Sequence, residues 1–168
     1  IGLINDVPMT IIAKPEMAAK NLQELLAYLK ANKEKVNYAH AGVGAASHLC
    51  GMMFMSAVQT DVTTVPFKGT GPALAALIGN QVDFMCDQTT NTTSQIKAGK
   101  VKVYGITSKR RVASLADVPT LDEQGMKGFE IGIWHALYAP ARTPKPVIDR
   151  LSAALQDAVR DEAVKKRF

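Results

Sequence analysis

The sequence predicts an α/β fold in which helices cover both faces of a doubly wound, mostly parallel sheet. Short apolar runs typical of buried strands alternate with longer segments whose leucines and alanines recur at helical spacing. The connections between them are short and rich in glycine, proline and threonine. This alternation is typical of parallel strands joined by crossover helices, and such sheets bind ligands at the carboxyl ends of their strands.

The first half of the chain contains the clearest local signals. Asn21 followed three residues later by Glu24 is the pattern of a capping box, which predicts a helix from Leu22 to Ala31. The other elements expected here are strands at 9–13, 37–41 and 62–67 and helices at 47–58 and 73–78. Pro72 suits the first position of the last helix, and Gly79 suits its end.

The second half continues the alternation. We expect strands at 82–86, 101–107 and 131–138 and helices at 92–98, 120–125 and from 143 onward. The segment 108–118 is expected to be a charged connection. One face of the last helix is predicted to be apolar, and its residues are Val147, Ile148, Leu151, Leu155, Ala158 and Val159.

Composition limits the classes of protein to consider. The chain has 168 residues, of which 47% are hydrophobic and 21% charged, as in a globular domain with one core. No apolar stretch approaches the length that spans a membrane, so we expect no direct membrane insertion. The net charge of +5 favours anionic partners in a general way. Basic residues are densest between 97 and 111, but Tyr104 is the only aromatic residue among them and no recognition helix accompanies them, so we expect a solvated rim and no nucleic-acid partner.

The cysteines and histidines do not form a metal-binding pattern. Cys50 and Cys86 are the only cysteines, and His40, His48 and His135 lack metal-site spacing with them. We therefore expect neither a metal nor a cofactor. Both cysteines are expected to be small buried residues, and a disulfide between them would require their helix and strand to abut.

The most informative stretch is 36–48, which predicts a strand, a tight turn and a helix. The turn is built from small residues, which are Ala41, Gly42, Gly44, Ala45, Ala46 and Ser47. The first amides of a helix have no intrahelical partner and carry partial positive charge, so this turn could hold a carboxylate or phosphate. The spacing narrowly misses the dinucleotide fingerprint, and no acidic residue closes the next strand, which argues against a nucleotide. A turn without a ligand is the alternative.

Two further polar turns come after the next two strands. One contains Gly69 and Thr70, and the other begins at Asp87. Because the carboxyl ends of parallel strands meet at one edge, all three turns are expected to converge there. The Asp87 carboxylate would accept a hydrogen bond from an amino, amide or hydroxyl group of the ligand. The alternative is that Asp87 caps the polar run directly after it.

Catalytic residues are not evident. Ser47 and His48 are adjacent and Asp87 is available, but no Gly-x-Ser-x-Gly elbow is present, and neighbouring helix residues project about 100° apart. We expect His48 to pack or to hydrogen-bond locally and regard the other two histidines as structural. The sequence therefore predicts a binding protein and not an enzyme.

The motifs resemble those of the Bug-type solute receptors of bacterial tripartite tricarboxylate transporters. The central motif is Gly42-Val43-Gly44-Ala45-Ala46-Ser47-His48-Leu49. The other matching stretches, in order, are 37–39, 65–69, 72–74, 79–83 with Asp87, 96–101, 106–110, 117–120, 139–141 and 143–144. They extend over essentially the whole chain.

This resemblance implies a type II periplasmic-binding-protein fold, whose two lobes close on a small, usually carboxylate-bearing solute. The expected partners are a small organic acid or amino acid and the membrane permease subunits of the transporter, and the expected location is the periplasm. Residues 1–13 would be a crossing strand from a missing first lobe, 14–131 the ligand-binding lobe, and 132–168 a crossing strand and returning helix. The chain begins at Ile1 without methionine, so we expect a processed product or a fragment.

Two other functions compete with the receptor. The effector domains of LysR-type transcription regulators resemble the same two-lobe fold and would make the chain a ligand sensor. An α/β enzyme acting on a carboxylic acid is the third class.

Overall fold

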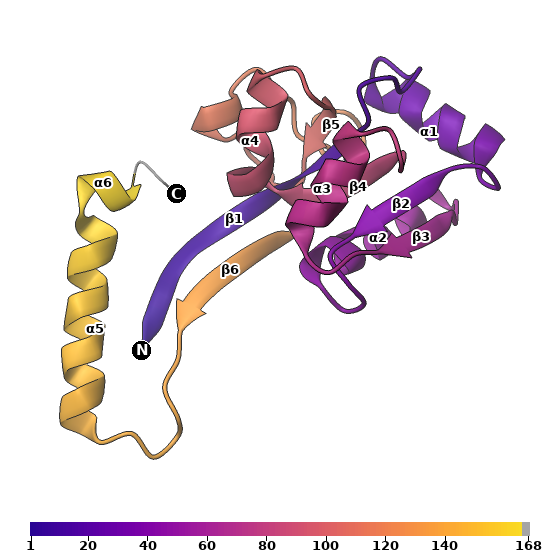
Figure 1. Ribbon diagram of the computed structural model, residues 1–168. Helices are drawn as coiled ribbons and strands as arrows, with labels where there is room; N and C mark the ends of the chain where they lie inside the picture. The colour runs from indigo at the N-terminus through magenta and orange to yellow at the C-terminus, as the bar shows by residue number, and fades with distance from the viewer. Residues whose placement is uncertain (166–168) are drawn as a thin grey trace. The chain divides into compact units, whose positions relative to one another are not determined.

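The computed structural model describes residues 1–165, which belong to two units (Figure 1). The larger unit comprises Pro8–Gly132, and the smaller one combines Ile1–Val7 with the chain from Ile133 onward. The candidate site lies wholly within the larger unit, so each unit is described by itself.

The larger unit contains a sheet with strand order β3-β2-β4-β1-β5. The strands are β1 (Gly2–Ala13), β2 (Asn37–His40), β3 (Thr63–Pro66), β4 (Phe84–Gln88) and β5 (Lys102–Ile106). β2 is parallel to both β3 and β4, whereas β1 is antiparallel to β4 and β5. Four strands therefore share one direction. The mostly parallel α/β sheet predicted from the sequence is confirmed, with β1 as the antiparallel exception.

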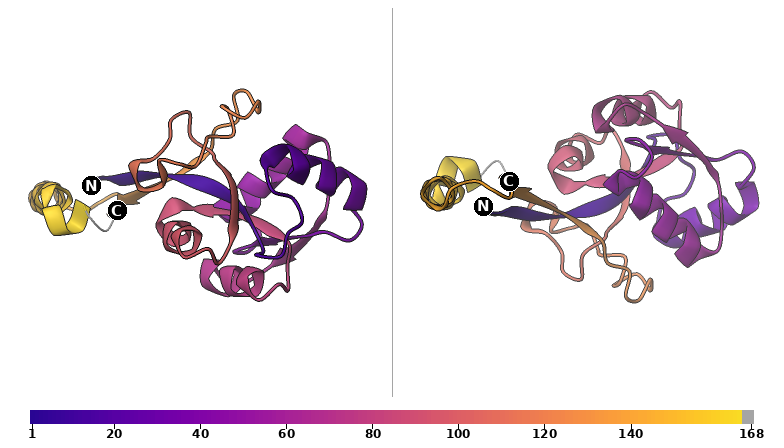
Figure 2. Two further views of the ribbon diagram at one scale, coloured as in Figure 1. Left: turned by 90° about the horizontal axis from the view of Figure 1, so that it is seen from above. Right: turned by 90° about the horizontal axis from the view of Figure 1, so that it is seen from below.

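Helices cover both faces of this sheet, as predicted. α1 (Leu22–Asn32) and α2 (Ala46–Val58) lie on one face, and α3 (Thr70–Ile78) and α4 (Thr89–Lys97) lie on the other (Figure 2). The chain passes outward from β2 to β3 through α2 and returns across β2 to β4 through α3. Because such crossovers are right-handed, the two helices must cover opposite faces.

The core beneath α2 is aromatic and is closed by a disulfide. The ring centroids of Tyr38 and Phe84 are 4.9 Å apart, and all atoms of both side chains are buried. Cys50 in α2 and Cys86 in β4 are fully buried and form a disulfide with a Cα–Cα distance of 6.1 Å. The helix and the strand abut, so the cysteines are buried as expected but are bonded to each other.

The prediction of a helix at 120–125 is wrong, because the structure has only a turn there. A capping box forms, because the Glu123 amide donates to Thr120 Oγ1 and the Thr120 amide donates to Glu123 Oε2. The chain then makes a single turn and leaves it at Gly125, whose φ is +101°. The Gln124 side chain donates to the Tyr104 carbonyl, which fixes this turn against β5. A start signal without enough helix-forming residues after it gives a turn and not a helix.

Several boundaries also differ from the prediction. β1 begins at Gly2 and not at Met9, α4 begins at Thr89 and not at residue 92, and α3 begins at Thr70. Pro72 is thus the third residue of α3, where its missing N–H still costs no intrahelical hydrogen bond. The charged connection contains a short 3₁₀ turn at Ala113–Leu115.

In the smaller unit, β6 (Gly132–Leu137) pairs with β1, and α5 (Lys145–Arg160) and α6 (Glu162–Lys165) come after it. Gly2 faces Leu155 of α5, and Ser152 Oγ donates to the Ile1 carbonyl. No residue of α5 is buried among the described residues, so its predicted apolar face is largely exposed there. Within residues 1–165, no helix combines the length and hydropathy needed to cross a membrane. The same residues contain no cluster of His, Cys, Asp and Glu arranged to hold a metal ion.

Gly51 of α2 is predicted to be required for the close approach of α2 to the sheet. A Cβ atom there would overlap two ring carbons of Tyr38, so Gly51→Ala should lower the free energy of unfolding by about 2–3 kcal/mol. Gly71 of α3 is the matched control, because a Cβ there meets nothing within 4 Å. Gly71→Ala should raise the same free energy by about 0.5–1 kcal/mol in urea denaturation. Equal effects of the two substitutions would contradict this account.

Candidate functional site

The structure brings the three predicted turns together at one edge of the sheet. The Phe67 amide donates to the His40 carbonyl at 2.8 Å, and the Gly69 amide donates to the Ala41 carbonyl at 3.3 Å. Thr70 Oγ1 lies 3.5 Å from Asp87 Oδ1. The convergence of the three turns is therefore observed, whereas ligand binding by their residues stays a prediction.

The first turn depends on two glycines with positive φ. Gly42 has φ +121° and Gly44 has φ +79°, which residues with a Cβ rarely adopt. A hydrogen bond from the Ala45 amide to the Gly42 carbonyl closes the turn. A Cβ on Gly44 would meet nothing within 4 Å, so the space beside this glycine is open to an approaching ligand.

Three backbone amides of this turn already donate hydrogen bonds to nearby side chains. The Ala41 amide donates to Ser47 Oγ at 2.9 Å, and the Gly42 amide donates to His40 Nδ1 at 3.3 Å. The Gly44 amide donates to His48 Nδ1 at 3.2 Å. His48 has the local role expected from the sequence, and the Ser47 hydroxyl supports the turn.

The available donors are the first amides of α2. Ala45 is the N-cap residue and provides no side-chain hydrogen bond. The amides of Ala46, Ser47 and His48 have no hydrogen-bond partner among residues 1–165. The sequence correctly predicts small residues at this helix start. It does not reveal that the side chains of Ser47, His40 and His48 accept hydrogen bonds from the amides of Ala41, Gly42 and Gly44, in that order.

The helices that start at this edge share a second property. α2, α3 and α4 each begin without an acidic residue in the first turn and without a side-chain cap. In α1, by contrast, Asn21 Oδ1 accepts from the Glu24 amide at 2.9 Å, and Glu24 Oε1 accepts from Asn21 Nδ2. α1 starts at the opposite edge, because β1 is antiparallel. The partial positive charge of three helix starts is thus gathered at a single edge without an acidic residue in any of the three first turns.

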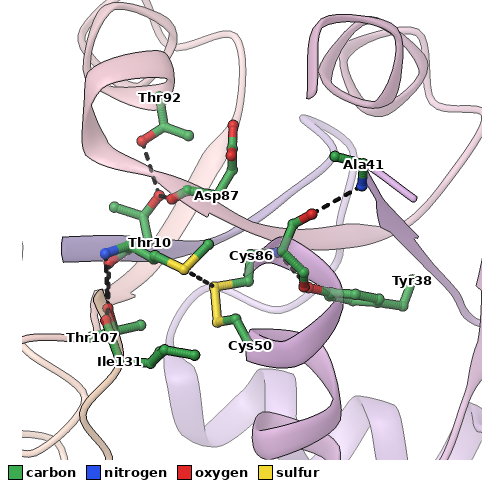
Figure 3. The surroundings of a disulfide bond; sticks show 11 residues. Thr10, Tyr38, Ala41, Cys50, Cys86, Asp87, Thr92, Thr107 and Ile131 are labelled. Atoms are coloured by element: carbon green, nitrogen blue, oxygen red, sulfur yellow. Dashed lines mark hydrogen bonds between the residues drawn. A yellow bond between two sulfur atoms is a disulfide. The ribbon is translucent and has the colours of Figure 1, made fainter. Parts of the chain in front are cut away.

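Asp87 is the penultimate residue of β4, the central strand of the sheet, and Figure 3 shows its side chain near Thr10 and Thr92. It is 2% exposed, and Asn91 Nδ2 donates to its Oδ2 at 3.2 Å. Burial raises the pKa of Asp87 to about 6, and hydrogen bonds from the Gln88 amide and from the Asn91 and Thr70 side chains offset part of this rise. No Lys, Arg or His forms an ion pair with it within the described part of the chain. The contact with Asn91 in α4 also fits the capping alternative.

Sequence reasoning missed the residues that hold Asp87 in place. Thr10 Oγ1 donates to the Asp87 carbonyl at 3.2 Å and lies 2.9 Å from Thr92 Oγ1. A single threonine within the apolar run of β1 was the only available signal. Oε1 of Gln88 is buried without a hydrogen-bond partner in residues 1–165, which leaves an acceptor unused beside Asp87.

A large groove of about 890 Å³ lies elsewhere on this unit. It runs between α1, α2 and residues 125–129 and is lined by apolar side chains such as Met52, Met53 and Phe129. No set of free helix amides converges on it within the described residues. The chemistry of anion binding therefore favours the sheet edge over this groove.

Comparisons with known proteins agree on one family. The model of the family described as "Tripartite tricarboxylate transporter family receptor" matches residues 1–168. A UPF0065 protein from the TAR-I ttuE-ttuC' intergenic region of Agrobacterium vitis is 49% identical over 168 residues, which cover 100% of this chain and 49% of that protein.

Two solved structures are also similar to this chain. The periplasmic binding protein BugD has a TM-score of 0.96 and 54% identity, over 99% of this chain and 56% of its own. MatC from Rhodopseudomonas palustris with bound malate has a TM-score of 0.94 and 39% identity, over 98% of this chain and 56% of its own. The chain thus spans about half the length of these relatives.

The raised pKa of Asp87 predicts a pH-dependent cost to stability. Its carboxyl is neutral in both the folded and unfolded states only below about pH 3, because its folded pKa is about 6 against an ordinary 3.8. The free energy of unfolding therefore falls as the pH rises through this window. Asp87→Asn should match the wild type below about pH 3 and exceed it by on the order of 3 kcal/mol above pH 7.

Asp122 provides a control of opposite sign in the same denaturation series. A hydrogen bond from the Gly128 amide and another from Lys127 hold the pKa of Asp122 below its usual range. Its contribution is present above the ordinary pKa of a carboxyl and is lost as the pH falls. Asp122→Asn should therefore be less stable than the wild type at pH 7, and the difference should vanish in acid. A constant effect of Asp87→Asn across the pH range would contradict this prediction.

Proposed function

The chain belongs to the tripartite tricarboxylate transporter receptor family, and we propose that it contains the ligand-binding lobe of an extracytoplasmic solute receptor. The proposed lobe comprises residues 14–131 and is flanked by segments 1–13 and 132–168; residues 9–13 of β1 also complete its sheet by pairing with β4. Its ligand is a small carboxylate-bearing metabolite. The partner is the permease of the transporter, which receives the solute.

The observation that carries this proposal is the convergence of three uncapped helix starts at one sheet edge. Unpaired amides with aligned dipoles bind a carboxylate without any cationic side chain. The proposed binding residues are Ala41, Gly42, Gly44, Ala45, Ala46, Ser47, Gly69, Thr70 and Asp87. Ala46 and Ser47 would donate directly, because their amides are free, and the glycine turn would provide access.

Asp87 adds a hydrogen-bond acceptor to a proposed site that otherwise consists of amide donors. A buried carboxylate without a cation beside it suits a ligand that carries a hydrogen-bond donor in addition to its carboxylate. A hydroxy acid or an amino acid meets both requirements. The malate bound to MatC is a compound of this type, which supports the same ligand class here.

The compartment and the function class are inferred from the family. BugD is described as a periplasmic binding protein, and the buried Cys50–Cys86 disulfide suits an oxidising compartment such as the periplasm. The family is one of receptors, which favours solute binding over catalysis. None of the named relatives is a LysR-type regulator, so the effector-domain alternative gains no support.

Binding of four-carbon acids tests the proposal directly. We expect succinate, malate or aspartate to shift the amide NMR signals of Ala46, Ser47 and Thr70, with a dissociation constant near the millimolar range because one lobe desolvates only one side of the ligand. Gly44→Val should abolish these shifts, because it strains the turn and fills the open space beside Gly44.

Gly99→Val is the matched control for this experiment. Gly99 also has a positive φ, +65°, and open space around it, but it lies after α4 at the opposite end from the site. This variant should bind as the wild type does. Failure of all three acids to bind the wild type would contradict the proposed function, and unchanged binding by Gly44→Val would contradict the location of the site.

Asp87 is predicted to distinguish the three acids, which share one carbon skeleton. If its carboxylate pairs with the ammonium group of aspartate, Asp87→Asn should weaken aspartate binding by at least about 2 kcal/mol, which from a millimolar starting affinity abolishes the measurable aspartate shifts, and should leave succinate binding unchanged. Aspartate binding by the wild type should also strengthen as the pH rises through about 6, since Asp87 becomes charged. Equal losses for aspartate and succinate would instead favour the capping role of Asp87.

A further inference from the structure

Tyr38 connects the two halves of the candidate site from beneath. Its hydroxyl donates to the Ser47 carbonyl at 2.5 Å and accepts from the Cys86 amide at 3.0 Å. Ser47 belongs to the first turn of α2, and Cys86 directly precedes Asp87. The side chain is fully buried, and burial raises the pKa of Tyr38 far above its usual range, so the hydroxyl keeps its proton. Figure 3 shows this arrangement.

The Tyr38 hydroxyl meets the Cys86 amide at the end of the ladder between β2 and β4. The pairing of β2 with β4 consists of Tyr38 with Phe84 and Ala39 with Met85. Cys86 lies one residue beyond the last pair, where the side chain of Tyr38 brings a further acceptor to its buried amide. Removing the Tyr38 hydroxyl would take one hydrogen-bond partner from both the Ser47 carbonyl and the Cys86 amide, so the hydroxyl has a role that a phenyl ring could not take over.

The disulfide joins the same two segments. Cys50 is three residues after Ser47 in α2, and its partner Cys86 is the residue whose amide Tyr38 binds. Gly51 then allows the Tyr38 ring to lie directly against the α2 backbone. Two independent connections, one covalent and one through hydrogen bonds, thus link the start of α2 to the end of β4.

We propose that the Tyr38 hydroxyl and the Cys50–Cys86 disulfide together fix the separation between the free amides of α2 and the Asp87 carboxylate, which makes Tyr38 a positioning residue for ligand binding. This inference rests on the proposed function. The amides would hold one end of the ligand and Asp87 the other. A sideways shift of α2 would change the distance between these two groups, so both connections act on the fit of the ligand.

Tyr104 provides a matched control for Tyr38. It is also a buried tyrosine, 3% exposed, and its hydroxyl donates to the Ala19 carbonyl at 2.7 Å. That hydrogen bond connects β5 to the segment before α1 and involves no residue of α2 and not Asp87. Tyr38→Phe and Tyr104→Phe each remove one buried hydroxyl and keep the ring, so a general loss of stability should affect both alike.

The test combines hydrogen exchange with malate titration on the full chain. In Tyr38→Phe, the amides of Leu49, Cys50 and Gly51 should exchange about fivefold faster, the factor that corresponds to one ordinary hydrogen bond. Malate affinity, followed by amide NMR shifts, should fall by a similar factor. Tyr104→Phe should leave both quantities unchanged. The Cys50→Ala/Cys86→Ala double variant should accelerate exchange at Leu49 and Gly51.

The outcomes separate this inference from the proposed function. Unchanged exchange in Tyr38→Phe would overturn the connection itself, whether or not malate binds. Faster exchange with wild-type malate affinity would overturn the positioning role. If the wild type binds none of the four-carbon acids, the proposed function fails, and the exchange measurements still decide whether Tyr38 restrains α2.

Discussion

The parallel direction of β2, β3 and β4 is the constraint on which the candidate site depends. Neighbouring parallel strands must each be followed by a helix that starts at the same edge. The turns after these strands lie within hydrogen-bonding distance of one another, from Phe67 to His40 and from Thr70 to Asp87. If one strand were reversed, its helix would start at the opposite edge, as α1 does. The strand directions therefore determine where the site lies, and the side chains at this edge determine what it can bind.

Local sequence was enough to predict much of this arrangement. The glycines and alanines at 41–47, the capping box at Asn21 and the apolar runs indicated the elements and the edge where the turns meet. Asp87 could be identified because a charged residue at the end of a buried run is unusual. These signals are encoded within a few neighbouring residues, and backbone propensity and periodicity are local properties.

The features that escaped prediction depend on contacts between distant residues. Whether Thr10 supports Asp87, whether Tyr38 reaches Cys86, and whether the two cysteines meet are decided by packing across the sheet. The antiparallel direction of β1 is also a matter of tertiary arrangement. The failed helix at 120–125 shows the same limit, because its start signal is real but the contact of Gln124 with β5 holds the chain in a single turn. Residues that position a site are harder to predict than residues that face the ligand.

The disulfide has a topological consequence for the second turn. Cys50 and Cys86 are separated by 36 residues, and the closed covalent ring between them contains all of β3 and α3. Gly69 and Thr70 therefore belong to a cycle anchored at both ends beside Asp87. A single break in the backbone of this cycle, for example after the exposed Lys68, would release no fragment. The molecule would remain one covalent piece, and the two new chain ends would lie at the site edge.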